Sequence, residues 1–297
     1  MNTMPVEVWS AVTRAAGVCR IVAEHSWPDP ARNRLWELEP ATVTVRLIVK
    51  QHATTTAYQR EVAAYQHVTR ALGEDRTPDL VTTCEESRTL VLTRIPGSLV
   101  SGLRLDADEQ LEVFRQAGEL LAKLHALAAP VPGPGGVTWQ DEVAQVTPLL
   151  TTLPIESALM LDKLLAEGPP PLPPITTHGD WLPHNWLWDD DSSRLRIIDF
   201  EETGTAPRRR TDFARLGYRI LRGHPDLDDS FRHGYGRGFS RAEHQSMRRS
   251  AALDALHTLR QGRTHHDNAA VAEAHTMIDH LHADQYESWH TTTRSRA

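Results

Sequence analysis

Three polar side chains within residues 175–201 have the types and the spacing that phosphoryl chemistry needs. Asp180 is followed five residues later by Asn185, and Asp199 comes fourteen residues after Asn185. Short apolar stretches around them predict strands joined by tight turns, at Ile175–Thr177, Trp186–Trp188 and Leu195–Ile198. Strands paired through a tight turn hold their ends close together. The segment therefore predicts a small volume that contains two carboxylates and a carboxamide, which suits a base beside a hard metal ion.

The same residues form a motif that resembles a known signature. It consists of His178-Gly179-Asp180, Asn185 and Ile198-Asp199-Phe200-Glu201. This motif resembles that of the aminoglycoside phosphotransferase and choline kinase family, whose members are small-molecule kinases with a protein-kinase-like fold. The resemblance implies that Asp180 is the catalytic base and that Asn185 and Asp199 bind Mg²⁺. Gly179 stands where protein kinases have an arginine that commonly receives a phosphorylated activation loop, which points to the small-molecule branch.

The resemblance also assigns nucleotide-binding residues in the N-terminal part of the chain. Lys50 ends an apolar strand and matches the lysine that reaches the α- and β-phosphates of ATP; a strand-end lysine in water is the alternative. Glu61 lies eleven residues later and matches the helix glutamate that pairs with this lysine; a solvent-facing charge is the alternative. The backbone of Thr93, Arg94 and Ile95 is expected to hydrogen-bond the purine, with GTP as the alternative to ATP.

The loop expected to cover the phosphates departs from the family pattern. Such loops are usually rich in glycine, because backbone N–H groups must approach phosphate closely. Here the chain has no glycine between Gly17 and Gly73. Ser26 and Asn33 are the donors that the loop offers instead, and we rank its contribution to nucleotide binding low.

The order of the predicted elements indicates an α+β protein with two lobes. An antiparallel five-stranded sheet with a helix precedes a larger, mainly helical region, as in the protein-kinase-like fold that the resemblance implies. We place a nucleotide-binding lobe at residues 1–95 and a catalytic and substrate-binding lobe at residues 96–297. Strands of the sheet are predicted at 18–23, 34–38, 43–49, 80–84 and 89–93. Helices are predicted at 4–16, 55–71, 106–126, 141–150, 156–167, 212–222, 226–236, 240–261 and 268–289.

The composition of the 297 residues is that of an ordinary globular protein, with 40% hydrophobic and 24% charged residues. The formal charge of −7 argues against a nucleic-acid partner and suits a cationic substrate. Cys19 and Cys84 do not suggest a disulfide framework. Neither a signal peptide nor an apolar stretch of the ~18–20 residues that a membrane span requires is recognisable. We therefore expect a cytoplasmic protein without a membrane partner, and its oligomeric state stays open.

Four further residues have structural alternatives to a functional role. His125, at the end of a predicted helix, is expected in the core and not in catalysis. Trp181 lies next to the proposed base, and both core packing and stacking on a ligand stay open. Asp212 resembles a buried aspartate that supports the catalytic loop in the family. Glu201 either helps the metal shell from outside or is a solvated charge.

Three hypotheses for the function come from different classes. The first is an ATP-dependent phosphotransferase that acts on a hydroxyl of a small molecule, with an aminoglycoside-like cationic antibiotic as one candidate. The second is a kinase of a cellular metabolite, such as an amino alcohol or a sugar. The third is a non-catalytic family member that binds a nucleotide or a partner. The presence of Lys50, Asp180, Asn185 and Asp199 together argues against the third.

Overall fold

The computed structural model describes residues 4–26, 32–42, 44–127, 138–204 and 211–284. The chain divides into two compact units. The first comprises Met1–Gly135, Pro174–Ala206 and Ser230–Gly236, and the second comprises Gly136–Pro173, Pro207–Asp229 and Arg237–Ala297. Lys50, Asp180 and Asp199 all belong to the first unit. The lobe boundary expected after residue 95 stays a prediction.

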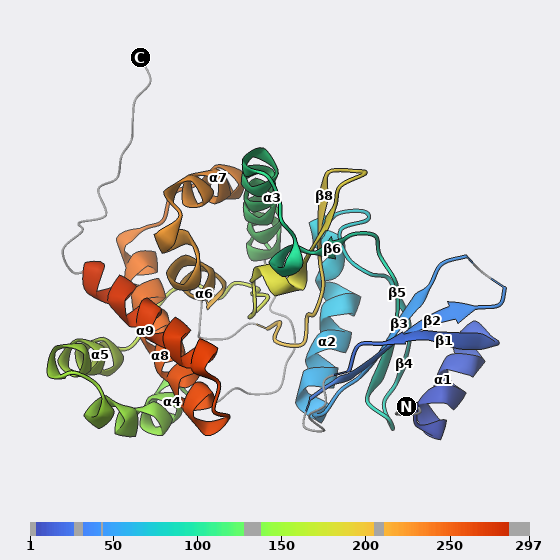
Figure 1. The fold of residues 1–297 in the computed structure, drawn as a ribbon, viewed down its shortest axis with the longest axis horizontal. Helices are drawn as coiled ribbons and strands as arrows, with labels where there is room; N and C mark the ends of the chain where they lie inside the picture. Colours follow the sequence, from blue (N-terminus) through green and yellow to red (C-terminus); the bar gives the residue numbers. More distant parts are fainter. Residues whose placement is uncertain (1–3, 27–31, 43, 128–137, 205–210, 285–297) are drawn as a thin grey trace, which may run out of the picture. The chain divides into compact units, whose positions relative to one another are not determined.

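A five-stranded antiparallel sheet forms the N-terminal part of the first unit (Figure 1). The first three strands form the expected meander, and the last two have the expected bounds. The predicted start of the third strand at Val43 lies outside the described residues, and Thr44 and Val45 form a bend, so that pairing begins at Leu47. The strands are β1 (Cys19–Glu24), β2 (Arg34–Pro40), β3 (Leu47–Gln51), β4 (Leu80–Cys84) and β5 (Thr89–Thr93), in the spatial order β1-β2-β3-β5-β4.

The two faces of this sheet have different neighbours. Helix α1 (Val6–Ala16) covers one face, and its buried residues Val8 and Val12 share an apolar cluster with Trp36, Leu38, Leu47, Val49 and Val91 (Figure 1). Burial of each such Val or Leu side chain stabilises the fold by about 1.5–3 kcal/mol. Because side chains alternate along a strand, Ile48 and Lys50 face the opposite side of the sheet. That opposite face is therefore available for chemistry.

Helix α2 (Thr55–His67) brings a carboxylate to the face that carries Lys50. Its N-cap is Thr54, whose hydroxyl accepts the Ala57 N–H at 3.2 Å and so satisfies one free donor of the first turn. Glu61 and Tyr65 lie one turn apart on its buried side. The predicted helix 55–71 is divided at Val68, after which Thr69–Leu72 form a separate 3₁₀ turn.

Helix α3 (Ala107–His125) packs closely on the last turns of α7 (Pro225–Tyr235). It begins with the expected capping box, in which Asp106 and Glu109 each bond the other's backbone N–H. A Cβ atom on Gly118 or Gly234 would overlap backbone atoms of the facing helix, so only glycine permits this approach. At the end of α3, the buried His125 places Nδ1 3.0 Å from the hydroxyl of Tyr235. This confirms the expected core position of His125.

A second, three-stranded sheet carries the motif. Its strands are β6 (Ser98–Leu99), β7 (Trp186–Asp189) and β8 (Arg194–Ile197), in that spatial order. The hairpin of β7 and β8 matches the prediction. The strand predicted at Ile175–Thr177 is wrong: within the described part of the chain, Thr177 forms an isolated bridge with Gly204 in place of a strand ladder. The chain turns at Gly179 immediately afterwards, with φ +89°.

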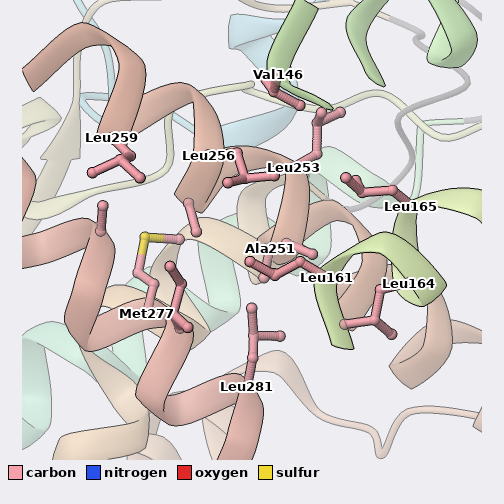
Figure 2. Packing of buried hydrophobic residues seen from close by; sticks show 14 of the residues in the cluster. Val146, Leu161, Leu164, Leu165, Ala251, Leu253, Leu256, Leu259, Met277 and Leu281 are labelled. Atoms are coloured by element: carbon pink, nitrogen blue, oxygen red, sulfur yellow. The ribbon is translucent and has the colours of Figure 1, made fainter. Parts of the chain in front are cut away.

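The described residues of the second unit form helices without strands. They are α4 (Trp139–Val146), α5 (Ile155–Glu167), α6 (Thr211–Arg219), the first turn of α7, α8 (Arg241–Thr264) and α9 (Asn268–Ala283). Val146 of α4 and leucine, alanine and methionine side chains of α5, α8 and α9 converge in one apolar cluster (Figure 2). The expected end of the last helix at Trp289 lies outside the described residues.

The architecture confirms the predicted α+β class, with an antiparallel five-stranded sheet first and helices later. No helix in the described part of the chain combines the length and the apolarity needed to cross a lipid bilayer.

Candidate active site

Lys50 and Glu61 meet on the inner face of the five-stranded sheet. The Lys50 Nζ lies 2.7 Å from Glu61 Oε2, and both side chains are almost fully buried. The register of β3 aims Lys50 away from the α1 cluster, and the first two turns of α2 bring Glu61 toward it. Burial raises the pKa of Glu61, but Lys50 and His52 outweigh it and lower the pKa from 4.5 to about 2. The pair is therefore charged at neutral pH.

Two more carboxylates reach the same ammonium from the segment after β8. Nζ of Lys50 lies 2.6 Å from Asp199 Oδ1 and 3.0 Å from Glu201 Oε2. Burial by itself lowers the pKa of Lys50, but the attraction of Asp199, Glu61 and Glu201 raises it well above its usual value. Asp199 has a φ of +65°, a left-handed conformation that costs about 1–3 kcal/mol.

The loop of residues 178–185, called the catalytic loop below, is shaped by a buried histidine. Nε2 of His178 lies 3.1 Å from the carbonyl of Ile198, so it donates, and Nδ1 accepts the N–H of Asp180 at 3.3 Å. These two bonds fit the neutral ring with its proton on Nε2. His178 therefore holds Asp180 in place through the backbone, in agreement with the expectation that it shapes the loop.

Gly179 is required by a close approach of two backbone segments. A Cβ atom built on it would lie 2.5 Å from the carbonyl oxygen of Glu202 and 2.7 Å from the Cβ atom of Glu202, and its φ is +89°. An arginine at this position would meet both obstacles. The replacement of the protein-kinase arginine by glycine therefore has a local steric reason in this chain.

The carboxylate of Asp180 is held by two neighbours from the same loop. Nδ2 of Asn185 donates to Asp180 Oδ2 and to the Asp180 carbonyl, each at 2.9 Å. Nε2 of His184 lies 2.7 Å from the same Oδ2. The side chain of Asp180 keeps 22% exposure, so a substrate hydroxyl can reach it. The arrangement fits a carboxylate that accepts a proton.

Main-chain hydrogen bonds join the three parts of the site. The Ile198 N–H donates to the Asn185 carbonyl at 3.0 Å, which connects the catalytic loop to the residue before Asp199. The Phe200 N–H donates to Glu61 Oε1 at 3.1 Å, which connects the residue after Asp199 to helix α2. Asp199 is thus fixed from both sides. The catalytic loop, the β8 end and α2 act as one connected cluster.

The side-chain oxygens of Asn185 and Asp199 are suitable ligands for a hard cation. The amide nitrogen of Asn185 is engaged by Asp180, while its Oδ1 has no hydrogen-bond partner among the described residues. Asp199 uses Oδ1 for Lys50 and is 36% exposed. Carboxylate and carboxamide oxygens are the ligands that Mg²⁺ prefers. The metal role of these two residues stays a prediction.

Ser26 and Asn33, the two donors proposed for the phosphate loop, bond to the protein itself. The Ser26 hydroxyl exchanges hydrogen bonds with the backbone of Leu35, at 3.1 and 3.3 Å. Asn33 accepts the Ala53 N–H at 3.0 Å and donates to Glu201. The rest of this loop, residues 27–31, lies outside the described residues. Asn33 therefore fastens the loop to the cluster around Lys50.

In the hinge segment, two of the three predicted backbone donors bond within the protein. The Thr93 N–H donates to the Asp79 carbonyl at 2.9 Å, and the Arg94 N–H donates to the Arg46 carbonyl at 2.8 Å. The N–H of Ile95 has no acceptor among the described residues. Of the three predicted hinge residues, Ile95 is therefore the one whose backbone can donate to a purine, and this role stays a prediction.

Sequence reasoning missed His52 and His184, and it left Glu201 undecided. His52 Nε2 lies 2.6 Å from Glu61 Oε2, and Glu201 contacts Lys50. The available signal for His52 was its position two residues after Lys50, directly after the end of β3, where strand-like alternation places both side chains on the same side. His184 precedes Asn185 directly. Trp181, left open above, is fully buried and packs edge-on against His178, so packing is the correct interpretation.

The sequence pattern of the phosphotransferase enzyme family matches residues 28–253, about three quarters of the chain. The chain belongs to this family. The match spans Lys50, Glu61, Asp180, Asn185 and Asp199, so the cluster described above lies inside the region that defines the family. Membership assigns the protein to the phosphotransferases. No curated protein matches this phosphotransferase by sequence.

Solved structures with the same fold include those of aminoglycoside phosphotransferases. A thermostable variant of APH(4)-Ia in ternary complex with ADP and hygromycin B has a TM-score of 0.69 and 17% identity, covering 95% of this chain and 99% of its own. APH(2")-IIia in complex with GDP and kanamycin has a TM-score of 0.66 and 14% identity, covering 94% and 99%. These likenesses establish the kinase-like fold of the phosphotransferase.

Proposed function

We propose that this phosphotransferase moves the γ-phosphate of a nucleoside triphosphate to a hydroxyl of a small molecule. The observation that carries the proposal is the contact of one buried ammonium, Lys50, with Glu61 of α2 and with Asp199 after β8. This contact joins the expected phosphate-binding lysine to the expected metal-binding aspartate. Asp180 lies on the adjacent loop, tied to the same cluster through Asn185 and Ile198.

Each residue has a role in the reaction. Lys50 binds the phosphate tail, and Glu61 aims its ammonium. The substrate hydroxyl oxygen forms a bond to the γ-phosphorus while the bond from that phosphorus to the bridging oxygen breaks, so that the nucleoside diphosphate leaves. Asp180 accepts the hydroxyl proton. Asn185 and His184 keep its carboxylate oriented for this transfer.

Mg²⁺ is the cofactor that the donor set fits. Asn185 Oδ1 and the carboxylate of Asp199 would hold the ion, which when bound neutralises charge on the phosphate oxygens. ATP is the preferred donor in this proposal, because the free N–H of Ile95 is complementary to the acceptor at N1 of adenine. GTP stays the alternative, and APH(2")-IIia is solved with GDP.

An aminoglycoside-like polycation is the first candidate for the acceptor. The formal charge of −7 favours a cationic ligand, and neighbours in fold are solved with kanamycin and hygromycin B. A cellular amino alcohol or sugar is the second candidate. Both are small hydroxylated molecules, and the cluster around Asp180 serves either. Neither candidate acceptor implies a cytoplasmic location, which stays an expectation.

The test is a turnover assay on the full chain. The protein is incubated with Mg·ATP and a panel of aminoglycosides, amino alcohols and sugars, and the release of ADP is followed. We expect acceptor-dependent ADP release with one class of the panel, and a matched series with Mg·GTP ranks the two donors. Tight nucleotide binding without turnover on any acceptor, unaltered in Asp180→Ala, would favour the non-catalytic alternative.

A further inference from the structure

The imidazole of His52 lies beside the Lys50–Glu61 pair and contacts Glu61. Its side chain has no exposed surface. Nε2 lies 2.6 Å from Glu61 Oε2, and Nδ1 lies 3.2 Å from the carbonyl oxygen of Arg88. The ring also packs edge-on against Tyr58, with the ring centroids 5.8 Å apart. Every direction around the ring is therefore filled by the protein.

Both ring nitrogens of His52 face acceptors. The carbonyl of Arg88 accepts only, and so does an ionised carboxylate. Glu61 is ionised, because Lys50 and the Phe200 N–H also donate to it. A neutral imidazole has one N–H and would leave one nitrogen lone pair against an acceptor oxygen, which is repulsive in a buried place. The ring satisfies both contacts only when both nitrogens carry protons.

The charges around the ring agree with a cation at this position. Glu61 of α2 and Glu201, whose Oε2 lies 3.9 Å from Nε2, are the anions that face it. Lys50 of β3 is the neighbouring cation, the Arg88 guanidinium bonds the His52 carbonyl, and Tyr58 presents its ring. Counting Asp199, the cluster has three carboxylates and one ammonium without His52. A cationic His52 brings it closer to neutrality.

The same groups have the spacing of a metal site, which is the competing interpretation. Ligand atoms of His52, Glu61 and Glu201 lie within 4.8 Å of one another. However, Nζ of Lys50 lies 2.7 Å from Glu61 and 3.0 Å from Glu201, so an ammonium fills the space between these carboxylates. A ligand histidine would also need a bare Nε2.

We propose that His52, as a doubly protonated imidazolium, is a positioning residue that holds the Glu61 carboxylate for Lys50. Glu61 then has three donors: Lys50 and His52 on Oε2, and the Phe200 N–H on Oε1. When Lys50 turns toward a phosphate, His52 and Phe200 keep Glu61 in place. Nucleotide affinity therefore depends on a side chain that never touches the nucleotide. This kinetic consequence rests on the proposed function, whereas the protonation of the ring does not.

Two isosteric variants separate the two hydrogen bonds of the ring. The amide nitrogen of Gln reaches the place of Nε2, so His52→Gln keeps a donor to Glu61. The amide nitrogen of Asn reaches the place of Nδ1, so His52→Asn keeps the donor to Arg88 and loses the one to Glu61. Histidine at the exposed position 67, at the end of α2, gives the control His67→Asn.

We expect His52→Asn to raise the KM for the nucleotide about tenfold, which corresponds to about 1.4 kcal/mol and to the loss of a charge-assisted hydrogen bond. Its kcat falls less, and its KM for the acceptor is unchanged, because Lys50 binds the phosphates in ground state and transition state alike. His52→Gln raises the nucleotide KM by clearly less. Equal effects of His52→Gln and His52→Asn, or none in His52→Asn, would overturn the positioning role.

The protonation itself is read without turnover. Nitrogen NMR of the full chain labelled with ¹⁵N-histidine gives two ring signals per histidine, and the pair lost in His52→Gln belongs to His52. We expect both signals at the shifts of protonated nitrogens at neutral pH. A neutral tautomer would contradict the proposal, and so would a Zn²⁺-induced shift of these signals, which would identify a metal ligand. Failure of the turnover assay alone leaves this readout intact, so the two failures are distinguishable.

Discussion

The ammonium of Lys50 lies 2.6 Å from Oδ1 of Asp199, although 149 positions separate the two residues in the sequence. Glu61 and Glu201 share the same ammonium. The ammonium of Lys50, a residue of β3, thus contacts three carboxylates. One comes from helix α2 and two come from the segment after β8. A lysine suits this place because a compact ammonium has three donors that point in different directions. It is one of only three lysines in a chain that uses arginine elsewhere.

Replacement of Lys50 should cost both stability and nucleotide binding. Lys50→Met leaves the buried Glu61 without its ammonium partner, and removal of one partner of a buried pair costs about 3–5 kcal/mol. We expect the low end, since Asp199 and Glu201 keep partial access to water. Urea unfolding measures the loss, and the exposed Lys163 gives the control Lys163→Met. A loss of equal size in both variants would contradict the cluster as its origin.

Replacement of Asp180 should remove turnover and spare nucleotide binding. Asp180→Asn keeps the volume and most hydrogen bonds but cannot accept a proton, so kcat should fall by about 10²–10⁴-fold. The affinity for ADP, measured by calorimetry, should stay close to that of the original chain. Asp191, exposed in the β7–β8 turn, gives the control Asp191→Asn. More than ~10% residual turnover in Asp180→Asn would show that another group is the base.

Gly179 should tolerate no side chain, for two separable reasons. Gly236 has a similar positive φ of +78°, but a Cβ atom there would meet nothing within 4 Å. Gly236→Ala therefore reports the conformational cost alone, about 1–2 kcal/mol. Gly179→Ala adds the overlap with Glu202 and should destabilise more, with loss of turnover. Denaturant midpoints compare the two variants, and equal shifts would mean that the Glu202 segment moves aside freely.

Asp199 should be the residue through which Mg²⁺ strengthens nucleotide binding. Asp199→Asn is preferable to alanine, because asparagine accepts the left-handed φ of +65° and so avoids new strain. In the unsubstituted protein, the affinity for ADP should be higher with Mg²⁺ present than with EDTA present. In the variant, this gain should be lost while binding in EDTA is retained. An unchanged response to Mg²⁺ would move the metal site away from Asp199.

The pH dependence of stability should carry the signature of Glu61. Its pKa in the folded chain is lowered from 4.5 to about 2, against the effect of burial, mainly by Lys50 and His52. A lowered pKa contributes stability that is present above the usual pKa and is lost as the pH falls through the window between 4.5 and about 2. Urea unfolding between about pH 6 and pH 3 should show a smaller loss in Glu61→Gln than in the original chain. Parallel profiles would mean that Glu61 is not coupled to the cluster.

The sequence by itself determined the chemistry-bearing residues and the order of the elements. Asp180, Asn185 and Asp199 were recognisable by type and spacing, and two short runs rich in β-branched and apolar residues on either side of a turn predicted β4 and β5 with correct bounds. Lys50 and Glu61 were identified through the family pattern. The strand predicted at Ile175–Thr177 failed because a short apolar run does not say whether a partner strand exists.

Only the tertiary structure decided which distant side chains meet. Alternation places Lys50 on a face of β3, but the approach of Glu61, Glu201 and Asn33 to that face depends on where helix α2 and two loops pack. Position 179 requires glycine because the backbone of Glu202 approaches it closely. The local sequence does not predict this approach. Burial of Trp181 likewise depends on how its neighbours pack. Contacts between segments remote in sequence arise from packing in three dimensions, and periodicity along one chain does not encode them.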